Sequence, residues 1–179
     1  MNNIIQKGAQ IEQQLIQKYE NSLPNGLLEI WRNYGFATLL DGYLRMINPE
    51  TYQNLLEETY FSGKSSIPIF ATAFGDIITS EEDSYIGMVQ YKNGNFAIIA
   101  RNFEHFMMNL PDDYFEEKYF QIPQYVKAVE KLGTLEQDEC FGYVPLLGLG
   151  GSEKIDNLRI VKTREHIELI SQMVGNIGM

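Results

Sequence analysis

Three runs rich in β-branched and aromatic residues constrain the fold of this chain more than any other feature. They are Ile67–Ile78, Tyr85–Tyr91 and Phe96–Arg101, and residues of these types are enriched in strands. Asn93-Gly94 lies between the last two runs and is a strong hairpin turn signal. Ser80-Glu81-Glu82-Asp83 is a polar, acidic connection between the first two. We therefore predict a three-stranded antiparallel meander in the middle of the chain.

The N-terminal part is expected to be mainly helical. Apolar residues recur roughly every four positions over residues 3–20, which predicts a helix there. A second helix is expected over residues 27–34, ended by Gly35. Its face includes Trp31, the only tryptophan, which we interpret as a core anchor. Residues 39–47 are predicted to form a bent strand.

A further helix is expected to begin at Asn48-Pro49 and to end at Gly63. Asparagine is a good N-cap residue, and proline suits the first helical position. After the sheet, helical spacing of apolar residues predicts three short helices near residues 103–110, 111–119 and 125–132.

The C-terminal stretch from Cys140 to Met173 predicts two short strands and a closing helix. The strands are expected at Tyr143–Leu147 and Leu158–Val161, joined by a glycine-rich corner at residues 148–151. We expect Thr163 to cap the helix. Its apolar stripe, which must be covered by earlier parts of the chain, consists of Ile167, Ile170 and Val174, widened by Leu169 and Met173.

These elements predict an α+β fold, with a central antiparallel sheet around residues 67–101 and helices at both ends. We divide the chain into a helical part, residues 1–63, and an α+β part, residues 64–179, packed as one compact unit.

The charge balance limits the class of partner. The formal net charge is −10, from 24 acidic and 14 basic residues. This balance repels nucleic acid and anionic membranes, since phosphate binding needs clustered Lys and Arg. It favours a basic partner, or serves solubility alone. The N-terminus has no apolar signal-peptide core, and no apolar run approaches the ~18 residues of a membrane span, so we expect a cytoplasmic protein.

No catalytic or cofactor-binding pattern stands out. Cys140 is the only cysteine, which excludes an internal disulfide, and we expect it to be a small buried residue. His105 and His166 lack the spacing of a metal pair. The corner at residues 148–151 lacks the lysine of a phosphate loop and the spacing of a dinucleotide-binding loop. We therefore expect no metal, no cofactor and no enzymatic activity.

Two stretches of the chain together resemble a known family. The first runs from Leu23-Pro24 through Leu27-Leu28 and Trp31 to Tyr34-Gly35, and then to Asn48-Pro49 and Tyr52. It resembles the bacterial GAD-like domain. The second contains Phe141-Gly142-Tyr143-Val144-Pro145, Gly150-Gly151, Asn157-Leu158 and Glu165-His166. It is similar to the domain that usually follows the first. The family includes immunity proteins that neutralise nuclease effectors of type VI secretion systems. The resemblance implies a cytosolic protein that binds a cognate toxin, with a basic nuclease domain as the expected partner.

Acidic residues gather at three connections or helix starts, where binding surfaces usually lie on a sheet scaffold. The first cluster is Glu81, Glu82 and Asp83, and the third is Glu136, Asp138 and Glu139. The second is Asp112, Asp113, Glu116 and Glu117, where Tyr114 or Phe115 would supply a buried anchor. A cation or acid/base site is a second interpretation of the second cluster, but acids in a first helical turn are also what the helix dipole favours. All three clusters are alternatively ordinary solvated surface.

Two other functions remain open at this point. One is a small-molecule sensor or enzyme with a pocket near Gly148–Gly151, where Tyr143, Glu153 and Lys154 would converge. It fails if the last helix packs the corner shut. The other is a regulatory scaffold that binds a housekeeping protein.

Overall fold

A computed structural model describes residues 5–178 of the chain. One antiparallel sheet has seven strands, and their order across the sheet is their order along the chain. These strands are β1 (Ile5–Gln6), β2 (Thr38–Leu39), β3 (Leu44–Met46), β4 (Ile67–Thr72), β5 (Ile77–Ser80), β6 (Ile86–Gln90) and β7 (Asn95–Ala100). A separate antiparallel pair is formed by β8 (Glu139–Tyr143) and β9 (Leu158–Lys162).

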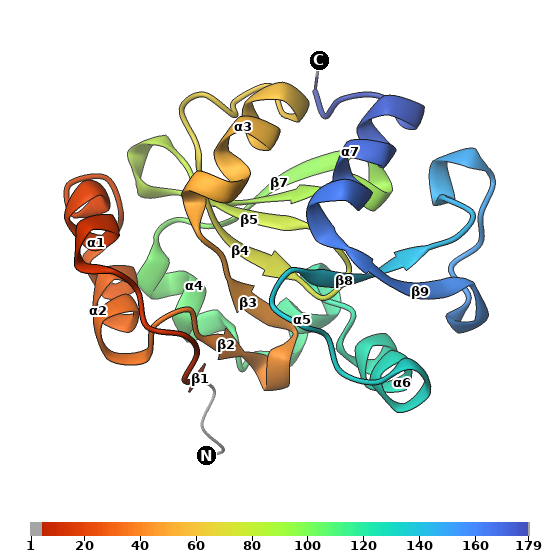
Figure 1. The fold of residues 1–179 in the computed structure, drawn as a ribbon, viewed down its shortest axis with the longest axis horizontal. Coiled ribbons are helices and arrows are strands. Elements are labelled where there is room, and N and C mark those ends of the chain that lie inside the picture. The colour runs from red at the N-terminus through yellow and green to blue at the C-terminus, as the bar shows by residue number, and fades with distance from the viewer. Residues whose placement is uncertain (1–4, 179) are drawn as a thin grey trace.

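Helices flank this sheet on both faces (Figure 1). They are α1 (Gln13–Tyr19), α2 (Asn25–Tyr34), α3 (Pro49–Thr59), α4 (Phe103–Asn109), α5 (Asp113–Tyr119), α6 (Ile122–Leu132) and α7 (Thr163–Val174). Figure 1 shows α3 and α7 side by side on one face, with α4 and α5 on the other. The predicted α+β class with a central antiparallel sheet is therefore confirmed.

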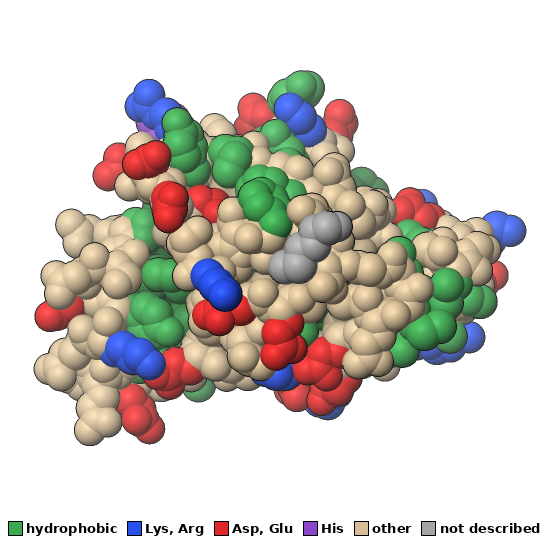
Figure 2. Space-filling view, turned by 90° about the horizontal axis from the view of Figure 1, so that it is seen from above, with side chains coloured by type: hydrophobic (Ala, Val, Ile, Leu, Met, Phe, Trp, Pro, Cys, Tyr) green, Lys and Arg blue, Asp and Glu red, His purple; other side chains and the backbone are tan. Residues whose placement is uncertain are grey.

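Each face of the sheet has its own apolar core. Under α3 and α7, the buried residues include Leu55, Leu56, Ala71, Ile77, Val89, Ile167 and Ile170. On the opposite face, they include Trp31, Phe70, Ile78, Met88, Phe103, Phe106 and Phe115. Viewed from the α3 and α7 side, the surface shows acidic side chains scattered among exposed hydrophobic ones (Figure 2).

Two local predictions are confirmed in atomic detail. Trp31 is only 1% exposed, and its ring lies 6.1 Å from that of Tyr19 and 6.4 Å from that of Phe36. The side chain of Asn48 accepts a hydrogen bond of 3.0 Å from the backbone N–H of Glu50 at the start of α3. Both residues perform the structural roles that their types favour.

The predicted N-terminal helix over residues 3–20 is wrong in its first half. Residues 3 and 4 lie outside the described residues, and Ile5–Gln6 is a strand that pairs with Thr38–Leu39. The helix begins only at Gln13. Gly8 explains the break, because a Cβ atom there would lie 1.8 Å from the carbonyl oxygen of Phe36. The backbone of Gly8 approaches that of Phe36 too closely for any other residue.

Two predicted strands each fold into a pair. The bent strand of residues 39–47 is β2 and β3, joined by a tight turn through Asp41-Gly42, a dipeptide typical of such turns. The run 67–78 is β4 and β5, which reverse direction at Gly75, where φ is +80°. The meander between residues 67 and 100 consequently has four strands rather than three.

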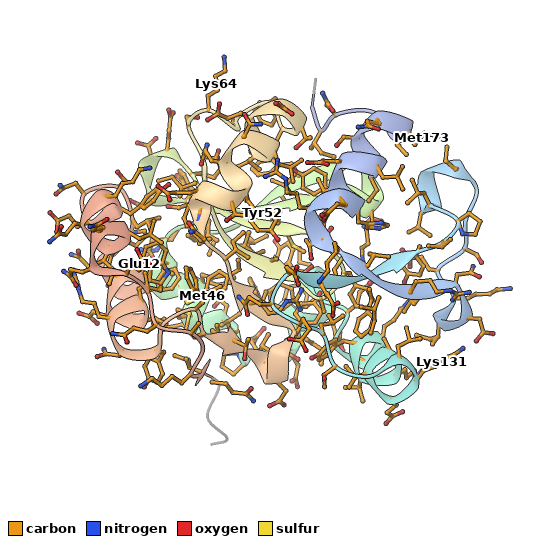
Figure 3. All side chains as sticks on the ribbon, in the orientation of Figure 1. Glu12, Met46, Tyr52, Lys64, Lys131 and Met173 are labelled. Atoms are coloured by element: carbon orange, nitrogen blue, oxygen red, sulfur yellow. The ribbon has the colours of Figure 1, made fainter. Side chains whose placement is uncertain are left out.

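The C-terminal stretch differs from its prediction in three respects. The first strand is Glu139–Tyr143 and not the predicted Tyr143–Leu147, because Pro145 cannot continue a ladder of backbone hydrogen bonds. Thr163 is a buried first residue of α7 and does not cap it. The helix buries only Ile167 and Ile170 of the predicted stripe. Leu169, Val174 and Met173 (Figure 3) are about half exposed.

The division at residues 63 and 64 stays a prediction. The sheet itself crosses that position, since β3 pairs with β4. Within residues 5–178, no helix is both long enough and apolar enough to span a bilayer.

Candidate partner-binding surface

The first acidic cluster divides into one internal and two exposed residues. The carboxylate of Glu81 accepts hydrogen bonds from Ser66 Oγ at 2.5 Å and from Thr79 Oγ1 at 2.5 Å. Glu81 therefore fastens the end of β5 to the segment that precedes β4. Glu82 and Asp83 are exposed in a turn of 3-10 helix where Asp83 has a φ of +56°. Only these two carboxylates are available to a partner.

The second cluster begins α5. Asp112 is its N-cap, and its side chain accepts a hydrogen bond of 2.9 Å from the backbone N–H of Phe115. Asp113 and Glu117 are exposed, while Glu116 is half-buried, and burial, followed by the nearby charge of Asp113, raises the pKa of the Glu116 carboxyl. This arrangement matches the preference of a helix N-terminus for carboxylates.

The two predicted aromatic anchors beside this cluster differ in accessibility. Phe115 is 5% exposed and packs against Phe106 and Phe120 in the core. It cannot reach a partner without disrupting that core. Tyr114 is 71% exposed, and the ammonium group of Lys118 lies 5.8 Å from the centre of its ring. Tyr114 is therefore the available anchor of the two.

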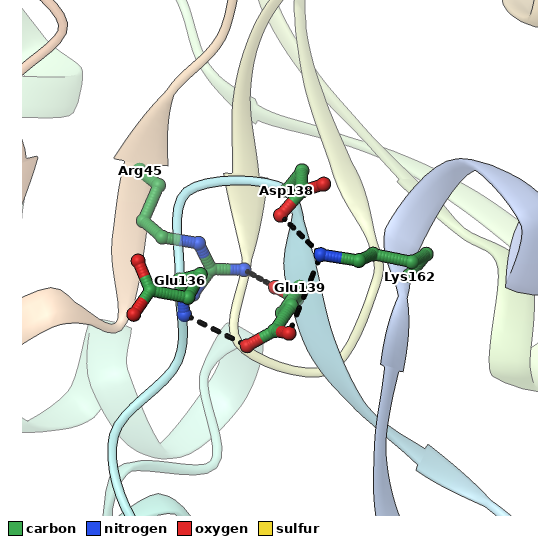
Figure 4. A network of polar contacts seen from close by, with 5 residues as sticks. All are labelled: Arg45, Glu136, Asp138, Glu139 and Lys162. Carbon is green, nitrogen blue, oxygen red and sulfur yellow. Dashed lines mark hydrogen bonds and ion pairs between the residues drawn. The ribbon is translucent and has the colours of Figure 1, made fainter.

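The third cluster is tied into a polar network (Figure 4). Lys162 on β9 forms ion pairs with Asp138 at 2.8 Å and with Glu139 at 3.4 Å. Glu139 also accepts a hydrogen bond of 3.0 Å from the backbone N–H of Glu136. The hydrogen bond from Lys162 lowers the pKa of the Asp138 carboxyl. The carboxylates of Asp138 and Glu139 are thus engaged within the chain, whereas Glu136 is exposed and joins the network only through its backbone N–H.

Arg45 lies beneath this network and is 1% exposed. Its guanidinium donates to the carbonyl oxygens of Gly42 at 3.2 Å, Thr72 at 3.1 Å and Glu139 at 2.5 Å. Burial lowers its pKa. Arg45 thus joins β3, the end of β4 and β8, and its role is to hold the β8–β9 unit against the sheet.

The three clusters do not form one surface. Glu81 follows Ser80, which pairs with Ile67 at the start of β4. Arg45 instead bonds both Glu139 and Thr72, the last residue of β4. The first and third clusters consequently lie at opposite ends of the same strand, so a single partner domain of modest size would meet one of them and not both.

The predicted pocket at the glycine corner is closed. The cavity there, between Tyr143, Gly148 and Val174, has a volume of about 10 Å³, which holds about one water molecule. The Tyr143 hydroxyl accepts a hydrogen bond from Gln124 Nε2 at 2.5 Å, while Glu153 and Lys154 are exposed on the loop. Burial raises the pKa of Tyr143, and the charge of Glu153 is near enough to contribute to this rise, but Val174 of the last helix packs against Gly148 and closes the corner.

Other candidate chemical groups are structural. Cys140 is fully buried, and burial raises the pKa of its thiol to about 12. His166 is 7% exposed, and burial lowers its pKa. His105 receives a hydrogen bond of 3.2 Å from Arg101 Nε. No group of three or more His, Cys, Asp or Glu residues within residues 5–178 is placed to hold a metal ion.

The sequence patterns did not predict that the charged residues Arg45 and Asp76 are buried. Asp76 is 1% exposed in the turn between β4 and β5, and burial raises its pKa to about 6. Arg45 and Asp76 each lie within a mostly apolar segment of the sequence. A charged residue in an apolar segment indicates either a turn or a buried polar contact. Alternation alone assigns such residues to solvent.

Comparisons with known proteins bear on both halves of the chain. Residues 2–91 match the family model of the GAD-like domain, and residues 100–174 match the model of the C-terminal domain of the T6SS immunity protein Tdi1. No curated protein sequence matches the chain.

The fold is also similar to a solved structure, the crystal structure of Atu4351 from Agrobacterium tumefaciens. The TM-score is 0.74 over 96% of this chain and 85% of that chain, at 16% identity. At this identity the likeness shows a shared fold alone.

Proposed function

The chain belongs to the GAD-like domain family, and from this membership we propose that it is a type VI secretion immunity protein that binds a cognate toxin and blocks it without turnover. One observation carries the proposal: a GAD-like match over residues 2–91 is followed directly by a match to an immunity-protein C-terminal domain over residues 100–174. The cytoplasm is the proposed site of action.

We further propose that the toxin is a basic nuclease domain. The net charge of −10 supports this, because complementary charge speeds diffusional encounter and disfavours wrong partners. Nucleases carry cationic surfaces to hold phosphate groups. An acidic protein that covers such a surface would inhibit the nuclease by occlusion.

Among the acidic clusters, the carboxylates of Glu82, Asp83, Asp113 and Glu117 are proposed to face the toxin. They are exposed, and no ion pair engages them within the described part of the chain. Glu81, Asp112 and Glu116 are proposed to support their neighbours, and Tyr114 is the proposed aromatic anchor.

Growth rescue tests the function directly. Co-expression of this protein with the toxin whose gene lies beside its own should restore the growth of cells that the toxin alone would kill. The two purified proteins should also form a complex. A toxin that still kills, with no complex in vitro, would refute the proposal.

Charge reversal then tests the acidic residues. Asp113→Lys with Glu117→Lys should slow association in a salt-dependent way, as rim charges do. Glu130→Lys, an exposed change on α6 outside the three clusters, is the control. Unchanged association for this double variant, for Glu82→Lys with Asp83→Lys and for Glu136→Lys with Asp138→Lys would exclude an acidic interface.

A further inference from the structure

The seven-stranded sheet has one long open edge. Its two outer strands are β1 and β7. Strand β1 is only two residues long, whereas β7 spans Asn95–Ala100 and pairs with β6 alone among the described residues. Figure 1 shows β7 at the side of the sheet opposite β1. In an antiparallel pair, alternate residues of the edge strand direct their N–H and C=O groups away from the neighbouring strand.

This edge lacks two of the usual protections, charge and proline, although the register shift between Ile86 and Gly87 places a β-bulge near its end, at Ile99. Folded proteins shield edge strands with charged side chains, proline or very short strands, because an open edge pairs with other chains. The sequence of β7 is NFAIIA, which contains no charged residue and no proline. The edge strand β9, in contrast, carries Arg159 and Lys162. The exposed fraction of Ile98, 45%, is high for an isoleucine within a strand.

Apolar side chains form a ledge beside the edge. Phe96 packs with the core under α3, and Ile98 points to the same side because strand residues two apart share a face. Phe61 is 55% exposed, and its ring centre lies 5.9 Å from that of Phe96. We call Phe61, Phe96 and Ile98 the apolar ledge. A strand added to β7 would place every second side chain over this ledge.

One end of the edge is acidic on balance, with two exposed carboxylates against one exposed cation, Arg101, which directly follows β7. Ala100, the last residue of β7, pairs with Ile86, which follows the turn that carries the exposed Glu82 and Asp83. A segment lying along β7 would reach these carboxylates at that end. Charge complementarity therefore selects a segment with Lys or Arg at the corresponding position.

We propose that β7 is the docking strand for the toxin, whose extended segment adds to the sheet, packs on the apolar ledge and ends in basic residues beside Glu82 and Asp83. This inference rests on the proposed function and narrows its surface to the side of Glu82 and Asp83. Asp113, Glu117 and Tyr114 on α5 belong to the opposite face of the sheet and lie outside this surface. Strand addition supplies affinity through main-chain hydrogen bonds, and the alternate side chains supply specificity. A second copy of this chain is a poorer occupant, because both copies carry a net charge of −10.

The test is amide hydrogen exchange of the full chain with and without a catalytically inactivated form of the toxin encoded beside its gene. Complex formation should slow exchange within residues 95–100. Ile98→Lys and Phe61→Lys should each weaken binding about tenfold or more, because each places a charge in the apolar contact. Leu169→Lys, at a site of similar exposure on α7, is the matched control and should bind as the unchanged protein does.

The outcomes separate the two proposals. Binding of the unchanged protein without protection of β7, or weakened binding only for Leu169→Lys, would overturn the docking strand and leave the immunity function standing. Absence of any binding by the unchanged protein would overturn both. Protection of β7 without toxin, lost on dilution and in Ile98→Lys, would show that a second copy occupies the edge and would also overturn the inference. Circular dichroism of each variant checks that it is folded.

Discussion

Replacement of Asp76 by Asn should make the protein more resistant to unfolding at neutral pH. Asp76 lies in the turn between β4 and β5 and is 1% exposed. The backbone N–H groups of Tyr91 and Lys92 donate to its carboxylate, but its Oδ1 atom has no hydrogen-bond partner among the described atoms. Burial raises the pKa of Asp76 from 3.8 to about 6, so at neutral pH the folded state holds a poorly compensated charge.

The sign and size follow from linkage. A carboxyl whose pKa is higher in the folded state stabilises the fold below pH 3.8, and this contribution is lost as the pH rises through 6. At about 1.4 kcal/mol per pKa unit, the gap between 3.8 and about 6 corresponds to roughly 3 kcal/mol. The Asp76→Asn protein has no such titration. Its free energy of unfolding relative to the unchanged protein should therefore rise by roughly 3 kcal/mol between pH 3 and pH 8.

Urea unfolding followed by the fluorescence of Trp31, the only tryptophan, measures this difference at several pH values. Asp138→Asn is a suitable control, because the hydrogen bond from Lys162 lowers the pKa of Asp138. The ionised Asp138 carboxylate stabilises the fold above pH 3.8, and this stabilisation is lost as the pH falls below that value. Its effect on the free energy of unfolding therefore has the opposite pH dependence to that of Asp76. A difference between Asp76→Asn and the unchanged protein that stays constant from pH 4 to pH 8 would refute the reasoning.

Three further substitutions or modifications have definite expectations. Arg45→Ala leaves the carbonyl oxygens of Gly42, Thr72 and Glu139 without this donor. Urea unfolding should show that the free energy of unfolding falls by about 3 kcal/mol or more, since each unsatisfied buried group costs about 1–3 kcal/mol. A fall below about 1 kcal/mol would contradict the role of Arg45 in holding β8 against the sheet. Asn48→Ala removes the N-cap bond of α3 and should lower the free energy of unfolding by about 1 kcal/mol, with Asn48→Asp as the retaining control. The buried thiol of Cys140, with its pKa raised to about 12, should react with a thiol reagent only after urea unfolds the chain; rapid labelling of the folded protein would show that the site opens locally.

Local chemistry made some of the fold predictable from the sequence. The Asn93-Gly94 turn, the Asn48-Pro49 helix start and the buried Trp31 are each determined by contacts within a few residues or by apolar burial. The position of Ile5 was not predictable in this way, because its partner in the sheet is Leu39. Helical spacing and a short apolar strand cannot be distinguished over so few residues.

The candidate site was less predictable than the fold. Three neighbouring acids look alike in the sequence, yet Glu81 is held by Ser66 and Thr79 while Glu82 and Asp83 are free of ion pairs within residues 5–178. That distinction depends on which hydroxyl groups the fold brings near. The open edge of β7 is likewise a property of the whole sheet, since it exists because no other strand among residues 5–178 pairs on that side.

The uninterrupted order of the sheet from β1 to β7 has a consequence for how the chain is made. Because each strand pairs with the next one in sequence, the sheet can assemble progressively as the polypeptide leaves the ribosome. The β8–β9 unit cannot, because Phe141 bonds Ala73 and Glu139 bonds Arg45 across 94 residues. The entropic cost of closing the loop between Arg45 and Glu139 can be met only after both segments have been synthesised. We therefore expect that a nascent chain released before α7 is made contains an ordered sheet with one apolar face uncovered. That incomplete form would be prone to aggregation and to proteolysis.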